Sequence, residues 1–130
     1  MGAMHRLQAI RQYRDSSVDA AMAAATPQQL VIMLLEGALD RIARARCAAL
    51  GNERAARLAH IGAAISVLEY LKLCLDPAGG ALSARLALLY DFCLRHLVQA
   101  NTARDVVGAL EEVAAVLRPI KQAWDELPAR

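Results

Sequence analysis

The sequence predicts an all-α protein, an antiparallel four-helix bundle with a short N-terminal helix or strap. Hydrophobic residues make up 57% of the 130 residues but aromatic residues only 4%, so alanine and leucine supply most of the apolar side chains. Such a composition favours packed helices over a sheet, which is rich in β-branched and aromatic residues. Apolar residues also recur at helical spacings, and the short links between the periodic segments favour antiparallel neighbours. We expect a strap over residues 1–25 and the bundle over residues 26–130.

The strap begins with MGAM, which is typical of a cloning remnant, so no role is assigned to it. An amphipathic piece, HRLQAIRQYR, precedes a stretch that is rich in small residues. We expect Tyr13, Val18 and Met22 to shield part of the outer face of the first long helix, because a large bare apolar patch promotes aggregation.

The first long helix is predicted over about residues 27–50. Thr26 is a favourable N-cap, Pro27 suits the first helical position, and Gln29 completes a T-x-x-Q capping box. The Gly-Asn pair that follows favours the end of the helix.

Six large apolar residues in a row, Leu30 to Leu35, lie near the start of this helix. At 3.6 residues per turn they point in nearly every direction, whereas a surface helix buries only one stripe. Either the helix is buried on several sides at the centre of the bundle, or part of its surface is a groove for a partner's amphipathic helix. The two interpretations are compatible if the strap takes the place of the partner.

Three more helices follow from the apolar spacing. The second covers about residues 53–75 and is ended by DPAGG, because proline cannot extend a helix and glycine frees the backbone. The third covers about residues 82–100 and is closed near Asn101, and the fourth begins near Val106. The predicted buried faces are Leu58, Ile61, Ile65, Leu68, Leu71 and Leu75; Leu82, Leu86, Leu89, Cys93, Leu97 and Ala100; and Val106, Leu110, Val113, Leu117, Ile120, Trp124 and Leu127.

The sequence also predicts the positions of two aromatic residues in the last two helices and a bend at a proline. Tyr90 lies off the main stripe of its helix, close to a second apolar pair, Leu88 and Phe92, so we expect it in or beside a groove. Pro119 removes a backbone hydrogen bond at a cost of about 3 kcal/mol in a regular helix, so we expect one bent helix. We expect the indole of Trp124 to sit in the bundle and anchor the last helix.

No sequence pattern indicates catalysis, a metal or a cofactor. Helical di-iron sites need Glu-x-x-His pairs, which the chain lacks. Cys93 and His96 lie at ligand spacing, but no second pair accompanies them. Nucleophile and phosphate-loop motifs are absent as well, so we expect a protein that is not an enzyme.

Charge and hydropathy also limit the partners and the location. The net charge is +2 and the arginines are scattered, so neither nucleic acid nor an anionic membrane is indicated. No apolar run reaches the roughly 20 residues that span a bilayer, and no signal peptide is recognisable. Three cysteines without C-x-x-C spacing argue against a disulfide framework. We therefore expect a cytoplasmic protein.

Several short motifs occur in a distinctive order. A tyrosine is followed by TPQQLVIMLLEGA at 26–38, LDPAGG at 75–80, LALLYDF at 86–92 and LVQANTARD at 97–105, with EEV and AWDE between 111 and 126. Each motif is weak alone, but together they cover nearly the whole chain. Their order resembles the FliS family, the cytosolic export chaperones of flagellin.

The resemblance implies a four-helix bundle that holds the disordered C-terminal segment of flagellin in hydrophobic grooves, prevents premature polymerisation and presents the segment to the flagellar type III export gate. It also implies that the chain's own N-terminal segment can lie over part of this surface. A monomer or weak homodimer is expected, and the alternative function is a bundle whose apolar face mediates homodimerisation. The residues expected to contact flagellin are Met33, Leu34, Leu35, Leu89 and Tyr90, and those expected to be structural are Thr26, Pro27, Asn101 and Trp124.

Overall fold

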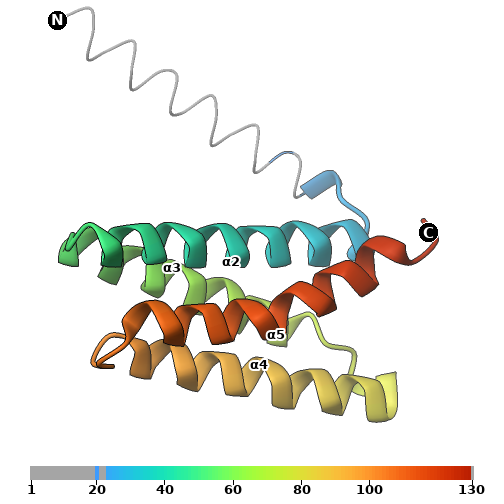
Figure 1. Cartoon of the computed structure of the whole chain (residues 1–130). Coiled ribbons are helices and arrows are strands. Elements are labelled where there is room, and N and C mark those ends of the chain that lie inside the picture. Colours follow the sequence, from blue (N-terminus) through green and yellow to red (C-terminus); the bar gives the residue numbers. More distant parts are fainter. Residues whose placement is uncertain (1–19, 21–22, 130) are drawn as a thin grey trace, which may run out of the picture.

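Four long helices form the bundle in a computed structural model that describes residue 20 and residues 23–129 (Figure 1). They are α2 (Pro27–Leu50), α3 (Arg54–Leu73), α4 (Gly80–Ala100) and α5 (Val106–Glu126), with a 3₁₀ turn, η1 (Pro77–Gly79), before α4. No strand occurs in this part of the chain, so the predicted all-α class is confirmed. Tyr13, Val18 and Met22 of the predicted strap lie outside the described residues.

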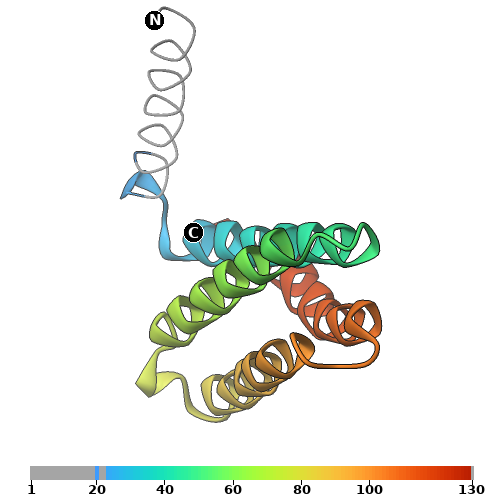
Figure 2. The same ribbon diagram turned by 90° about the vertical axis from the view of Figure 1, so that its left-hand side faces the viewer.

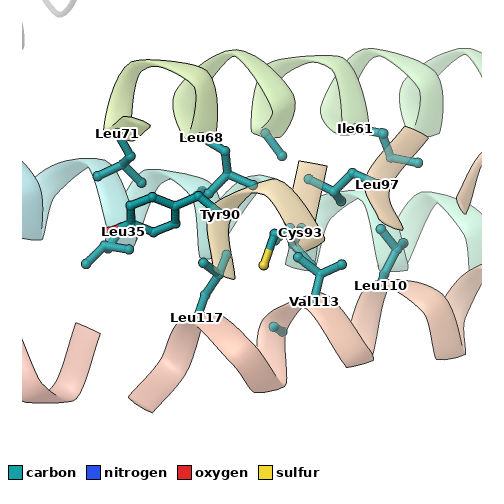
Figure 3. Packing of buried hydrophobic residues seen from close by; sticks show 14 of the residues in the cluster. Leu35, Ile61, Leu68, Leu71, Tyr90, Cys93, Leu97, Leu110, Val113 and Leu117 are labelled. Carbon is teal, nitrogen blue, oxygen red and sulfur yellow. The ribbon is translucent and has the colours of Figure 1, made fainter. Parts of the chain in front are cut away.

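The helices run up and down in order around a shared core. α2 packs against α3 and α5, and α4 packs against the same two helices from the other side. Figures 1 and 2 both place α2 and α4 on opposite sides of the bundle. The core is closed by apolar side chains of all four helices (Figure 3), among them Leu35, Ile61, Leu68, Leu71, Tyr90, Cys93, Leu97, Leu110, Val113 and Leu117.

Local capping fixes both ends of α2 as predicted. The Thr26 hydroxyl accepts from the Gln29 backbone N–H at 3.2 Å, and the Gln29 side chain accepts from the Thr26 N–H at 3.0 Å. Pro27 occupies the first turn. At the other end Asn52 takes a left-handed conformation with φ 54°, and the Glu53 N–H donates to the Ala48 carbonyl at 2.8 Å. These contacts satisfy end groups that would otherwise lack a partner.

The link between α3 and α4 lies two residues earlier than predicted, because α3 ends at Leu73 rather than near residue 75 and α4 begins at Gly80 rather than near residue 82. Asp76 caps η1 by accepting from the Ala78 N–H at 2.9 Å. Gly80 then has φ 62° and ψ −137°, a conformation that is essentially confined to glycine. The glycine therefore lets the chain turn sharply into α4.

α5 continues through Pro119 as one helix, and Figure 1 shows its second half inclined toward the start of α2. The prediction of one bent helix is confirmed. The Asp105 side chain caps its first turn by accepting from the Gly108 N–H at 2.9 Å. At its far end the Gln28 amide of α2 donates to the carbonyls of Trp124 and Leu127, at 3.4 and 3.2 Å.

Several predicted faces are corrected by the packing. In α4, Tyr90 takes a core position and is 1% exposed, whereas Leu89 is half-buried. The buried α4 residues are Tyr90, Cys93, Leu97 and Ala100, with Leu86 partly buried beside them. Cys93, Leu97 and Ala100 were predicted, and Tyr90 takes the inward position expected for Leu89, its neighbour about 100° away around the helix. Helix-end positions that were predicted to be buried are exposed instead: Leu58 by 40%, Leu82 by 68% and Leu127 by 49%.

Asn101 is the C-cap of α4, as expected, but its backbone stays in the right-handed helical region. Its side-chain oxygen is buried without a hydrogen-bond partner among the described residues. Trp124 is half-buried and packs against the core, so its predicted place in the bundle is only partly enclosed.

Candidate binding surface

The apolar run at the start of α2 divides between the core and one outer recess. Val31, Leu34 and Leu35 are buried, and Leu30 packs against them at the edge of the core. Ile32 and Met33 are half-buried and line a shallow recess of about 370 Å³ together with Ala24, Ala25, Gln29 and Glu36, which we call the α2 recess. The helix is therefore buried on several sides and still keeps a small apolar outer surface.

A second depression lies where the start of α2, the α3–α4 link and the end of α5 converge. We call it the end cavity; it has a volume of about 160 Å³ and is lined by Val31, Leu71, Cys74, Leu75, Asp76, Leu82, Ser83, Leu86, Tyr90 and Trp124. Its lining is mostly apolar, and Leu82 at 68% exposed offers an accessible side chain to a partner. Such a depression suits the apolar side chains of a bound helix.

The titratable side chains of the end cavity are mostly uncharged near neutral pH. Burial raises the pKa of Tyr90 to about 12, with smaller contributions from the nearby Cys74 and Cys93. Burial also raises the pKa of the Cys74 thiol. Asp76 is the only acidic or basic residue in the lining, so the cavity favours uncharged ligand groups.

The five residues expected to contact a partner are not equally accessible. Met33 and Leu89 are half-buried and open to contact from outside. Leu34 is 8% exposed and Leu35 is fully buried, so neither is an outward position. Tyr90 is 1% exposed but forms part of the end-cavity wall. The predicted set thus separates into outer residues, core residues and one residue that belongs to both.

Sequence reasoning missed several lining residues, Ile32, Leu82, Leu86 and Trp124, as parts of a binding surface. A signal for Ile32 was present, because the buried α2 residues Val31, Leu35 and Ala38 follow spacings of four and three. Ile32 and Met33 fall on the other side of that stripe. No comparable signal marks the end cavity, which is assembled from segments that are distant in sequence.

The ligand spacing of Cys93 and His96 does not produce a metal site within the described residues. These residues hold no group of three or more His, Cys, Asp or Glu side chains that could bind a metal ion. Cys93 is buried in the core, whereas His96 pairs with Glu112 at 2.5 Å, so the two residues do not form a shared site.

No single helix of the described residues is long and apolar enough to cross a bilayer. The α3 helix and residues 77–100 meet the length and composition criteria only as a pair bent by 72°.

Comparison with known proteins gives a consistent family. The model of the family "Flagellar protein FliS" matches residues 8–130. The flagellar secretion chaperone FliSB of Pseudomonas aeruginosa is 36% identical over 123 residues, which cover 94% of this chain and 97% of the relative. The flagellar secretion chaperone FliS of Salmonella typhimurium is 35% identical over 126 residues, covering 95% and 93%, and that of Vibrio cholerae is 32% identical over 120 residues, covering 92% and 88%. The chain therefore belongs to the FliS family of flagellar secretion chaperones.

Proposed function

We propose that this protein is a cytoplasmic export chaperone that binds the disordered C-terminal segment of flagellin and keeps it from polymerising before export. The observation that carries the proposal is the pair of mainly apolar depressions beside the first turns of α2, the α2 recess and the end cavity. The names of the relatives, flagellar secretion chaperones, support an export role. The protein acts by binding, without catalysis or a cofactor, and hands the segment to the type III export gate.

Binding of a disordered segment must offset the conformational entropy that the segment loses. Apolar side chains at helical spacing can do so when each enters a depression that excludes water. Met33 in the α2 recess and Leu82, Tyr90 and Trp124 in the end cavity are the proposed contacts. Leu89 lies half-buried on α4, next in sequence to Tyr90, and is kept as a further proposed contact. Leu34 and Leu35 support this surface from the core.

The N-terminal strap is proposed to cover the α2 recess in the free chaperone. Ala24 and Ala25, the last two residues of the strap, line the recess beside Ile32 and Met33. Tyr13, Val18 and Met22 supply the larger apolar side chains that such a cover needs. Flagellin would then displace the strap, and the monomer would be the resting state.

Calorimetric titration of a flagellin C-terminal peptide into the full chain tests the proposal. Met33→Glu should weaken binding by about ten-fold or more, because a carboxylate in the recess loses its hydration. The matched control is Leu50→Glu, at the other end of α2, where Leu50 is 61% exposed and lines neither depression. It should leave the affinity unchanged. Absence of binding to the unmodified protein would reject the chaperone function.

A further inference from the structure

α4 presents a second side-chain stripe to solvent, on the side away from the core. We call it the α4 stripe; its members follow helical spacing and are all exposed: Ala81, Ala84, Arg85, Leu88, Phe92, Arg95 and Gln99. Leu88 is 69% exposed and Phe92 is 38% exposed. No member of the stripe lines the α2 recess or the end cavity. In Figures 1 and 2 its helix lies on the opposite side of the bundle from α2.

The Phe92 ring is held in place although it is exposed. It stacks on His96 with the ring centroids 5.1 Å apart and the planes 19° apart. His96 in turn contacts Glu112 of α5 through Nε2 at 2.5 Å. An aromatic side chain that is already ordered loses little rotamer freedom on binding, so Phe92 is a suitable anchor for a partner.

The charges of the α4 stripe are of one sign. Arg85 and Arg95 stand on either side of Leu88 and Phe92, and neither forms an ion pair with another described residue. The nearest acidic residue in sequence, Asp91, is bound by Lys72 of α3 at 2.6 Å. The stripe therefore combines an apolar centre with two uncompensated positive charges.

We propose that the α4 stripe is a docking site for an acidic amphipathic helix of a partner protein other than the flagellin segment. A helix with two or three apolar residues at spacings of three and four, flanked by Glu or Asp, matches its apolar centre and its charges. From residue 81 to residue 99 the stripe is about 27 Å long, enough for a partner helix of about five turns.

Charge also argues against a second copy of this chain as the occupant. Two α4 helices that meet at Leu88 and Phe92 in antiparallel orientation bring Arg85 opposite Arg95 of the second copy. In parallel orientation each arginine faces its own equivalent. Both arrangements place like charges together at the contact, which is unfavourable. On an acidic helix, Glu or Asp side chains opposite Arg85 and Arg95 would form attractive pairs instead.

The test uses two synthetic helical peptides of about 18 residues that lack tryptophan, with the same central leucines at i and i+4. One carries flanking glutamates and the other flanking lysines. Anisotropy of labelled peptides against the full chain should give at least about ten-fold tighter binding for the glutamate peptide. The double variant Arg85→Glu/Arg95→Glu should reverse the preference. The matched control Arg54→Glu/Arg104→Glu makes the same change of net charge away from the stripe. It should keep the preference for the glutamate peptide.

The single tryptophan separates this site from the proposed flagellin site, because Trp124 lines the end cavity. Binding at the α4 stripe should leave Trp124 emission unchanged. Equal binding of the two peptides, loss of the preference in the control variant, or a change in Trp124 emission would each overturn the proposal. A dimer in sedimentation equilibrium that Leu88→Glu dissociates would assign the stripe to a second copy instead. Titration of the flagellin peptide is a separate measurement, so the two proposals can fail independently.

Discussion

Tyr90 is the largest fully buried side chain of the described core, and it also forms part of the end-cavity wall. Burial is the main cause of its raised pKa, which moves from 10.0 to about 12. The unfolded chain therefore releases this proton near pH 10, whereas the folded chain holds it to about pH 12. The free energy of unfolding should fall as the pH rises through this window, because the unfolded state then binds fewer protons.

The free energy of unfolding can be measured by urea titration just below pH 10 and again near pH 12. Tyr90→Phe should show a smaller fall in this free energy between the two pH values than the parent protein. Burial raises the pKa of Cys93 to about 11 as well, so a smaller decline should persist. Tyr70→Phe is the matched comparison for loss of a hydroxyl, since Tyr70 is 47% exposed and lies outside the buried core. The assignment is wrong if Tyr90→Phe and the parent protein lose the same stability over this range.

Trp124 is expected to contribute to both stability and binding. Its ring is half-buried, so Trp124→Ala should cost about 2 kcal/mol, less than the 3–5 kcal/mol that is typical of a fully buried aromatic residue. The same change should weaken binding of the flagellin peptide, because the indole lines the end cavity. Trp124→Phe keeps most of the apolar surface and should retain most of both properties. Near-native stability of Trp124→Ala would contradict an anchoring role.

At the scale of the elements, the ends of α2 were predicted more accurately than the inward face of α4. The start and end of α2 depend on residues within a few positions, such as Thr26, Gln29 and Asn52, so local sequence is sufficient. The α4 face depends on whether Leu89 or Tyr90 points inward. Both residues suit a helical apolar stripe, and the choice is made by α3 and α5, which are distant in sequence. Local periodicity carries no information on that choice.

The turn into α4 gives a test of backbone strain. Gly80→Ala should destabilise the fold by about 1–3 kcal/mol, because φ 62° with ψ −137° is unfavourable for a residue with a Cβ atom. Gly62→Ala is the control: a Cβ atom there meets nothing within 4 Å, and Gly62 lies inside α3. It should stabilise the protein by about 0.5–1 kcal/mol. Thermal unfolding of both variants should show shifts of opposite sign.

Pro119 links the shape of α5 to the end cavity. Proline has no backbone N–H to donate, so Pro119→Ala should restore a helical hydrogen bond and stabilise the protein by up to about 3 kcal/mol. A straighter α5 would move Trp124 relative to Leu86 and Tyr90, so the affinity for the flagellin peptide should fall while stability rises. Unfolding and calorimetric titration measure the two effects. Higher affinity, or lower stability, would contradict this account of the bend.

The packing of all four helices determines which apolar residues stay accessible to a partner. α2 has neighbours on two sides, α3 and α5, and these neighbours enclose Leu34 and Leu35 while leaving Met33 beside the α2 recess. Composition and periodicity identified a surplus of apolar residues in this helix. They could not assign the individual residues, because the assignment follows from the order of the four helices around the core.

The strap hypothesis makes a prediction for the chain as a unit. The core residues of the part of the chain that the structure describes come from α2 to α5, so deletion of residues 1–20 should leave the bundle folded, with a cooperative unfolding transition close to that of the full chain. If the strap competes with flagellin for the α2 recess, its removal abolishes the cost of displacement and should tighten binding of the flagellin peptide, or at least preserve it. Met33→Glu should weaken binding in the shortened chain as well, since the recess itself remains. Lost binding on deletion, with the bundle intact, would instead make the N-terminal residues part of the flagellin site.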